Sequence, residues 1–261
     1  MTEKILTEQS GDIARIIFNQ PEKRNAVSLE MWEAVEAATT RFAADDSVRI
    51  LILSGAGGKA FVSGADVSKF ETERASADAV AYYNAATKRV YDLIEAFPKP
   101  TIAQIDGFCI GGGVALSLSC DLRICGEGSN FAVPAAKLGL GYGYEGLNRL
   151  VNVVGPAFAK EIFFTARRFT AEEARTMGLV NRVVPDDKVG QVAQETAEMI
   201  AANAPMTVVS AKYIVGQTLV DESKRDLDEC ARQVKACFES ADYIEGRRAF
   251  LEKRKANFVG A

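Results

Sequence analysis

The sequence predicts an α/β fold that ends in a purely helical segment. Residues 48–54 (VRILILS) form an almost unbroken apolar run before a glycine, which is typical of a strand buried on both faces. Residues 77–96 are typical of a helix, which Pro98 and Pro100 would end. From about residue 188 to 258 the pattern indicates helices only. Strands alternating with helices, followed by helices alone, predict an α/β core with a C-terminal helical subdomain.

The other elements follow from local signals along the chain. Residues 13–19 (IARIIFN) are β-branched and precede a Gln-Pro turn, so they predict a strand. Ser28 is expected to cap a helix with Glu30 in its first turn. Thr170 and Glu173 have the spacing of a capping box. The remaining predictions are a strand at 101–105, a helix opening on the glycines at 111–113, and a strand at 122–125.

The composition excludes several classes of protein. Of 261 residues, 48% are hydrophobic and 25% are charged, as in an ordinary globular enzyme, and the formal net charge is −4. A mildly acidic chain has no electrostatic footprint for nucleic acid. No apolar run approaches the roughly 20 residues that span a bilayer, and the N-terminal residues lack the apolar stretch of a signal peptide. We therefore expect a cytoplasmic protein with neither a nucleic-acid nor a membrane partner.

Cysteine and histidine usage narrows the chemistry. The five cysteines are odd in number, lack CxxC spacing and sit mostly in apolar runs, so we expect reduced, buried thiols and no zinc cluster. Histidine is absent, which removes the commonest general base and the commonest metal ligand. Ser-His-Asp, Cys-His and HExxH mechanisms are excluded. Acid–base chemistry must come from Asp, Glu, Tyr, Lys or Cys, and no metal or redox cofactor is predicted.

Two glycine-containing turns are the first candidates for a site. Ser63–Asp66 follows an apolar segment, and Gly107–Gly113 joins a predicted strand to a predicted helix. Glycines at a helix start expose backbone N–H groups, and the helix N-terminus adds positive partial charge. One N–H from each turn would form a pair of donors for an oxyanion. The alternative is that both are tight turns needed only for packing; the GxxxxGK[ST] pattern of a phosphate loop is absent.

Several segments in order resemble the crotonase superfamily, also called the enoyl-CoA hydratase/isomerase family. They are FVSGAD, PTIAQIDGFCIGGGVALSLSCDLRIC, FAVPAAKLGL, RLVNVVG and FLEKRKANF, and together they cover nearly the whole chain. The resemblance implies a spiral of ββα units over residues 1–200 and a helical trimerisation subdomain over residues 201–261. It also implies a homotrimer or a dimer of trimers, and an acyl-CoA substrate that brings coenzyme A with it.

The resemblance also implies the roles of particular residues. The two oxyanion-hole N–H groups fall on Ala65 and Gly112. Contacts with CoA or with the acyl group fall on a larger set, namely Arg24, Ala26, Ala65, Asp66, Gly111, Gly112, Ala115, Ala135, Phe250 and Lys253. For Arg24 and Lys253 the alternative is ordinary surface charge. We expect Asp66 to cap its own turn and not to act as a base.

The sequence departs from this family at the hydratase glutamates. Ala115 and Ala135 stand where the family carries one glutamate after the glycines and another after the proline of FAxPE. Alanine can neither hold a proton nor orient water, so ordinary syn-hydration is placed in doubt. Decarboxylation needs no base, because the departing CO₂ leaves its electron pair as the enolate. Tyr142 matches a tyrosine that faces the substrate carboxylate in methylmalonyl-CoA decarboxylase, although Ala65 replaces a histidine of that enzyme.

Glu145 is the other candidate for acid–base work. We place it in the same glycine-rich loop as Tyr142, where it could protonate the enolate or accept a proton. The alternatives are a solvent-facing glutamate and, for Tyr142, a packing aromatic. Three functions remain open: a carboxyacyl-CoA decarboxylase, a hydratase or isomerase that uses Glu145, and a family member that binds CoA esters without catalysis.

Overall fold

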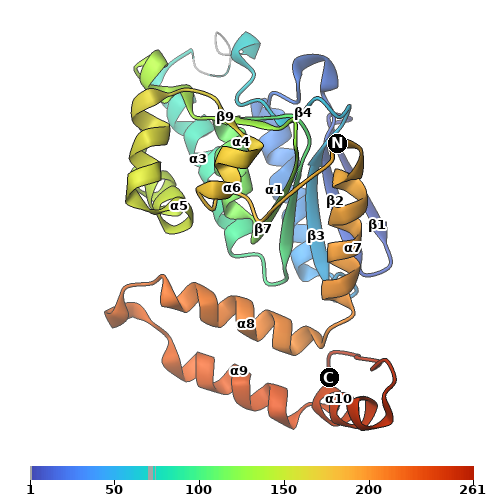
Figure 1. Ribbon diagram of the computed structural model, residues 1–261. Helices are drawn as coiled ribbons and strands as arrows, with labels where there is room; N and C mark the ends of the chain where they lie inside the picture. The colour runs from blue at the N-terminus through green and yellow to red at the C-terminus, as the bar shows by residue number, and fades with distance from the viewer. Residues whose placement is uncertain (1, 70–72, 74) are drawn as a thin grey trace.

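The computed structural model describes residues 2–69, 73 and 75–261. Two β-sheets lie at its centre, with helices around them (Figure 1). The six-stranded sheet has the order β1 (Ile5–Ser10), β2 (Ile13–Phe18), β3 (Ile50–Gly55), β5 (Thr101–Ile105), β7 (Leu122–Gly126) and β10 (Arg182–Val184). The four-stranded sheet has the order β4 (Ala60–Val62), β6 (Phe108–Ile110), β8 (Asn130–Ala132) and β9 (Phe169–Thr170).

From β3 to β8, consecutive strands alternate between the two sheets. β3, β5 and β7 pair in parallel in the larger sheet, and β4, β6 and β8, which follow them in the chain, pair in parallel in the smaller one. A helix closes each unit. These are α3 (Ala77–Glu95), α4 (Gly112–Ser119) and α5 (Tyr144–Thr165), after an opening α1 (Leu29–Ala44). Each ββα unit therefore gives one strand to each sheet, and the repeat advances the chain as a spiral.

Helices cover both faces of the larger sheet. Along β3, Ile50 and Ile52 pack with Ala193 and Ala197 of α7 (Val189–Ala201). Leu51 and Leu53 point to the opposite face, into the main core with α1 and α3. Because side chains alternate along a strand, a run that is apolar at every position indicates burial on both faces, as the sequence predicted.

Most of the predicted elements are confirmed, with two local corrections. Thr170 and Glu173 form the capping box of α6 (Ala171–Thr176). Ser28 is at the N-cap of α1, but its side chain makes no capping hydrogen bond and its oxygen is buried without a partner. Cys109, Cys120 and Cys125 are buried as expected, whereas Cys230 and Cys237 are only partly buried, because they lie on a helix that packs loosely on its own chain.

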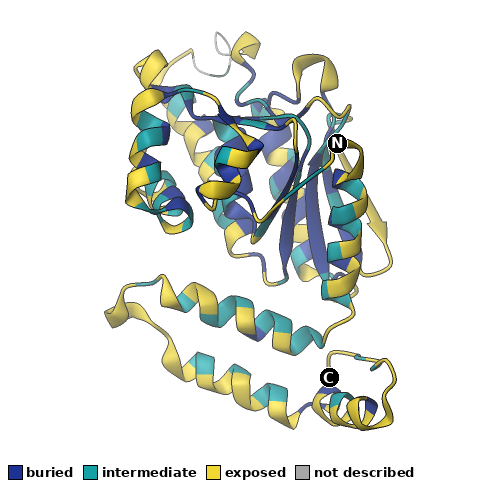
Figure 2. Ribbon diagram, viewed as in Figure 1, coloured by how far each residue is buried: buried dark blue, intermediate teal, exposed yellow. Residues whose placement is uncertain are grey.

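Three helices extend away from the sheets. They are α8 (Pro205–Thr218), α9 (Leu227–Glu239) and α10 (Ala241–Glu252), which together we call the C-terminal arm. Figure 2 shows its surface as mostly exposed or half-buried, and every residue of α9 is at least partly exposed. The division of the chain near residue 200 into core and subdomain stays a prediction. Within the described ranges, no helix combines the length and apolarity needed to cross a bilayer.

Candidate functional site

Parallel pairing of β4, β6 and β8 brings three predicted site segments to one edge. β4 ends at Val62, before the turn that holds Ala65, and β6 ends at Ile110, before Gly111 and Gly112. β8 ends at Ala132, shortly before Ala135. The carboxyl ends of neighbouring parallel strands lie at the same edge of a sheet, so residues far apart in the sequence converge there.

The two glycine turns touch. A Cβ built on Gly112 would lie 3.9 Å from the Cα of Gly64. A Cβ on the next residue, Gly113, would lie only 2.1 Å from the carbonyl oxygen of Val62, so glycine is required for α4 to approach β4 this closely. The close approach of α4 to β4 therefore sets the spacing of the two turns.

Each turn presents one N–H group without an acceptor among the described residues. Val27 donates to the Gly64 oxygen (2.8 Å) and accepts from the Asp66 N–H (2.9 Å). Backbone groups alternate sides along an extended segment, so the N–H of the intervening Ala65 points away from Val27. Gly112 is the first residue of α4, where an N–H has no partner inside the helix. Neither N–H donates in the hydrogen bonds of the described residues.

The segment before Val27 lines the first turn. The Ser63 N–H donates to the carbonyl oxygen of Arg24 (3.2 Å), and Ala26 is buried beside it. Arg24, predicted to contact CoA, therefore lies against the Ala65 turn through its backbone, and Ala26, also predicted to contact CoA, directly precedes Val27, which is hydrogen-bonded to both neighbours of Ala65.

Asp66 caps its own turn, as expected. Its carboxylate accepts from the Ser68 hydroxyl (2.6 Å) and the Ser68 N–H (3.1 Å), and it pairs with Lys23 (2.8 Å). Burial on its own would raise the pKa of this carboxyl, but the hydrogen bonds from Lys23 and Ser68 outweigh burial and lower the pKa to about 2. A carboxylate held this strongly is a poor base, so its role is to fix the turn.

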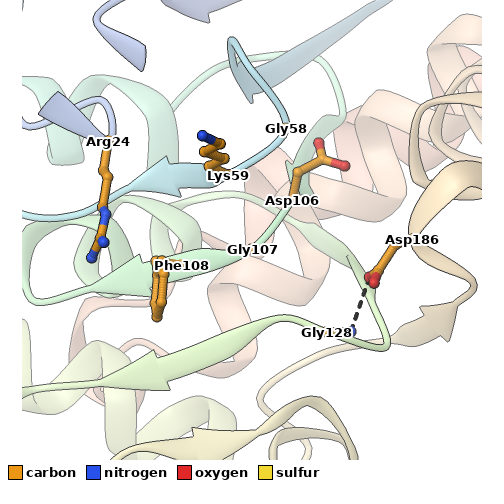
Figure 3. Close-up of a pocket in the computed structure, with 8 residues that line it drawn as sticks. All are labelled: Arg24, Gly58, Lys59, Asp106, Gly107, Phe108, Gly128 and Asp186. Atoms are coloured by element: carbon orange, nitrogen blue, oxygen red, sulfur yellow. Dashed lines mark hydrogen bonds between the residues drawn. The ribbon is translucent and has the colours of Figure 1, made fainter. Parts of the chain in front are cut away.

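The Arg24 side chain faces a cavity of about 380 Å³ that the other predicted site residues do not line. Figure 3 shows its guanidinium beside the Phe108 ring, 4.9 Å from the ring centroid, with Asp106 and Asp186 at the far end. The backbone of Arg24 thus contacts the turn that holds Ala65, whereas its guanidinium lies over the Phe108 ring on β6.

Ala115 and Ala135 give the edge apolar neighbours. Ala115 is half-buried one turn into α4, and Ala135 is buried in the short 3-10 helix Pro134–Leu138 that follows β8. The methyl groups stand where the hydratase glutamates were expected by resemblance, so no carboxylate at these positions can handle a proton.

Tyr142 and Glu145 do not share one loop, which corrects the sequence prediction. Tyr142 precedes α5, and Glu145 lies in the first turn of that helix. Because Gly143 serves as the N-cap, the glycine-rich pattern marks a helix start and not a continuing loop.

The surroundings of these two side chains also differ. Tyr142 is 36% exposed, but its ring packs edge-on against Phe163, with 4.9 Å between centroids, and desolvation by the atoms packed around it raises the pKa of its hydroxyl. Glu145 is exposed. The pKa of Lys88 on α3 is raised first by Asp92 and more weakly by Glu145, which places the Glu145 carboxylate near that exposed lysine.

Phe250 and Lys253 lie at the end of α10 and are exposed. Figure 1 shows α10 at the opposite end of the molecule from β4 and α4. Within one chain, the structure does not bring these two residues together with Ala65 and Gly112.

Sequence reasoning missed Tyr91. Its hydroxyl donates to the Gly112 carbonyl oxygen (3.1 Å), and its ring packs edge-on against Trp32. Burial, followed by the nearby Tyr142 and Tyr83, raises its pKa well above the usual range. The only sequence signal is a tyrosine two turns after Tyr83 in the predicted helix, and such spacing is equally common in a core face.

Comparison with known proteins identifies the family. A sequence model of the enoyl-CoA hydratase/isomerase family matches residues 8–261. A crotonyl-CoA hydratase of Syntrophomonas wolfei is 35% identical over 257 residues, covering 98% of each chain. A carnitinyl-CoA dehydratase of Salmonella arizonae is 35% identical over 265 residues, covering 100% of each chain.

Solved structures agree with the sequence comparison. An enoyl-CoA hydratase/carnithine racemase from Magnetospirillum magneticum superposes with a TM-score of 0.93 at 37% identity, covering 100% of this chain and 97% of that one. The enoyl-CoA hydratase of Bacillus anthracis gives 0.90 at 32% identity, covering 99% and 100%. The spiral of ββα units, the C-terminal helical arm and the two glycine turns at the ends of β4 and β6 are thus features of one class of protein. The chain belongs to the enoyl-CoA hydratase/isomerase family and is an acyl-CoA enzyme of that family.

Proposed function

We propose that the chain stabilises a thioester enolate with the N–H groups of Ala65 and Gly112, and that its reaction is decarboxylation of a carboxyacyl-CoA. The observation that carries the proposal is the contact between two turns that each present an N–H without an acceptor among the described residues. Two such donors fit the oxygen of a thioester as it becomes negative. One donor of this kind contributes about 2.7–4 kcal/mol to lowering a barrier.

The alanines favour carbon dioxide loss over hydration. In decarboxylation the bond between the α-carbon and the carboxylate breaks, and its electron pair moves into the enolate. A proton is then added at the α-carbon. No base is required, which suits a site with Ala115 and Ala135 in place of two glutamates. We assign Tyr142 to the substrate carboxylate, since its phenol stays protonated at neutral pH, and Glu145 or water to the final proton.

The second candidate is a hydratase or isomerase that uses Glu145. The relatives named crotonyl-CoA hydratase and carnitinyl-CoA dehydratase favour it. The exposure of Glu145 beside Lys88 makes it a weak match for a buried proton carrier. A third candidate is a protein that holds CoA esters without turnover, but a binder has no need for two N–H groups aimed at a developing charge.

One experiment separates the three candidates. Purified protein is incubated with malonyl-CoA, methylmalonyl-CoA and crotonyl-CoA, and the products are weighed by mass spectrometry. Loss of CO₂ from either carboxyacyl-CoA supports the decarboxylase. Addition of one water to crotonyl-CoA supports the hydratase and contradicts the decarboxylase. Binding of all three without any change in mass, and without any change in the enoyl absorbance of crotonyl-CoA that would report movement of its double bond, supports the binder.

A Glu145→Gln variant tests the carboxylate in the first turn of α5. If Glu145 supplies the proton, we expect kcat on the active substrate to fall by about 100-fold or more with KM little changed. Glu172→Gln is the matched control, because Glu172 is an exposed glutamate in the first turn of another helix, α6. Equal rates for wild type and Glu145→Gln would remove this carboxylate from the mechanism.

We also propose that the chain assembles as a homotrimer or a dimer of trimers through the C-terminal arm. The arm holds an apolar groove of about 690 Å³ between α8, α9 and α10. Large exposed side chains on it include Val234, Phe238, Ile244, Phe250 and Leu251. An apolar groove flanked by exposed apolar side chains is typical of an interface. In such an assembly, Phe250 and Lys253 could reach CoA bound to a neighbouring copy.

A further inference from the structure

Two tyrosines on α3 reach the two turns from one side, with the single tryptophan of the chain between them. Tyr83 is buried, and its hydroxyl accepts a hydrogen bond from Trp32 Nε1 (3.0 Å). Tyr91 lies two turns further along α3, and its ring meets the Trp32 ring edge-on at 5.5 Å. Trp32 is itself buried on α1. These three side chains, Trp32, Tyr83 and Tyr91, we call the aromatic brace.

The Tyr83 end of the brace holds the first turn. Its hydroxyl donates to the carbonyl oxygen of Val27 (3.3 Å). The same oxygen accepts from the Asp66 N–H, and Val27 donates to Gly64, so Val27 is hydrogen-bonded to the residues on both sides of Ala65. The position of Val27 therefore sets the direction of the Ala65 N–H.

The Tyr91 end of the brace holds the second turn. Its hydroxyl donates to the carbonyl oxygen of Gly112, the residue whose N–H is the other proposed donor. A Cβ on Gly112 would lie 3.3 Å from the Tyr91 hydroxyl and 3.9 Å from Trp32 Cζ2. Gly112 is thus in contact with two members of the brace.

We propose that the aromatic brace positions the two oxyanion donors, and that the hydroxyls of Tyr83 and Tyr91 are its working groups. This inference rests on the proposed function, because it assigns a role to residues that support the Ala65 and Gly112 N–H groups. The brace ties both turns to one rigid helix, so the two donors keep a fixed separation. Packing alone would need only the rings, and phenylalanine would serve equally well. The hydroxyls are what connect α3 to the two turns.

The test uses a thioester whose colour reports polarisation of its carbonyl. The probe is 4-dimethylaminocinnamoyl-CoA, whose absorption moves to longer wavelength when hydrogen bonds draw charge onto the thioester oxygen. The variants are Tyr83→Phe and Tyr91→Phe, which keep the rings and remove the hydroxyls. Tyr82→Phe is the matched control, since the Tyr82 hydroxyl lies on the same helix but donates to Glu33 at the surface. Far-UV circular dichroism and thermal unfolding establish that each variant is folded.

We expect the wild type and Tyr82→Phe to give the full red shift. Tyr83→Phe and Tyr91→Phe should each give less than half of it, with the Kd for the probe changed less than threefold. A full red shift in both brace variants would overturn the brace and leave the donor pair standing. Binding of the probe to wild type with no red shift would overturn the donor pair and the brace together. Should Tyr83→Phe fail to fold, Tyr91→Phe decides alone.

Discussion

At the scale of single residues, two features mark the candidate site. Positions 115 and 135 carry no carboxylate, and the carboxylate of Asp66 is held by hydrogen bonds. Ala115 on α4 and Ala135 after β8 carry methyl groups at positions where a hydratase of this family would carry carboxylates by resemblance. Asp66, by contrast, is a buried carboxylate whose oxygens are occupied by Lys23 and Ser68. The carboxylate next to Ala65 thus has a structural role, and in the proposed reaction proton transfer would come from other groups.

Introducing glutamates at positions 115 and 135 should give hydratase activity if the N–H groups of Ala65 and Gly112 form the proposed donor pair. We expect Ala115→Glu combined with Ala135→Glu to add water to crotonyl-CoA at least 100-fold faster than wild type, because positioned acid–base groups contribute about 10²–10⁴-fold each. The control is the Ala115→Gln, Ala135→Gln pair, which has similar size without proton-carrying groups. Equal hydration rates for the two double variants would contradict this expectation. Hydration is followed by the loss of enoyl absorbance.

Replacing Asp66 should destabilise the protein in a pH-dependent way. Its folded pKa is lowered to about 2, so the carboxylate contributes stability above its unfolded pKa, and this contribution is lost as pH falls from about 4 towards 2. We expect Asp66→Asn to lower the free energy of unfolding by about 2 kcal/mol at neutral pH. Urea unfolding should show a constant difference between pH 5 and 8 that shrinks below pH 4. A difference that grows on acidification would refute this assignment.

At the scale of elements, the sequence predicted those with a strong local pattern, and it missed α5 (Tyr144–Thr165) and β1 (Ile5–Ser10) although both are long. The helix at 77–96 and the buried strand at 48–54 were predictable, because each is long enough to show its period or its unbroken apolar character. β4, β6 and β8 have three residues each, too few to show alternation, and they were missed. The two glycine turns were found because glycine marks them directly.

Contacts between distant elements were the other limit on prediction. Trp32, Tyr83 and Tyr91 meet only after α1 and α3 pack together, and each alone looks like an ordinary core aromatic. The start of α5 at Tyr144 was not predicted, because the glycines before it suggested that the loop continues.

Adding one methyl group at Gly113 should disturb the meeting of α4 and β4. We expect Gly113→Ala to lower the free energy of unfolding by about 1–3 kcal/mol, because the new Cβ would clash with the Val62 carbonyl. It should also lower kcat, since the two turns would move apart. The control is Gly216→Ala in α8, where the Cβ meets nothing within 4 Å and helix propensity improves. Unchanged denaturation midpoints for Gly113→Ala would contradict the close approach.

At the scale of the whole molecule, the described chain separates into a well-packed spiral and an arm with apolar side chains at its surface. The inner strands of the larger sheet, β2, β3, β5 and β7, are mostly buried, whereas α9 keeps every residue at least partly exposed (Figure 2). An arm that buries so little of itself would gain stability in the proposed assembly by burying more surface against another copy.

A charge in the groove of the arm should separate the proposed assembly into single chains. Phe238 is 60% exposed and stacks edge-on with Tyr243 in the groove. We expect Phe238→Glu to reduce the mass measured by light scattering from that of a trimer or hexamer to that of one chain, because association would bury an unpaired carboxylate. Phe164→Glu, on α5 and outside the groove, is the control. A wild-type mass equal to one chain would remove the proposal.

The junction between the spiral and the arm has a consequence for how copies would meet. Arg49 donates to the carbonyl oxygens of Ala201 and Phe258, and Lys212 on α8 reaches both the Lys99 oxygen and Asp121. The Arg49 and Lys212 side chains therefore hold the arm against the spiral within a single chain, before two chains would meet. An incoming copy would meet a surface already in its final shape, so little entropy would be lost in ordering the arm. Collision frequency, and not a slow rearrangement, would then govern the speed of assembly.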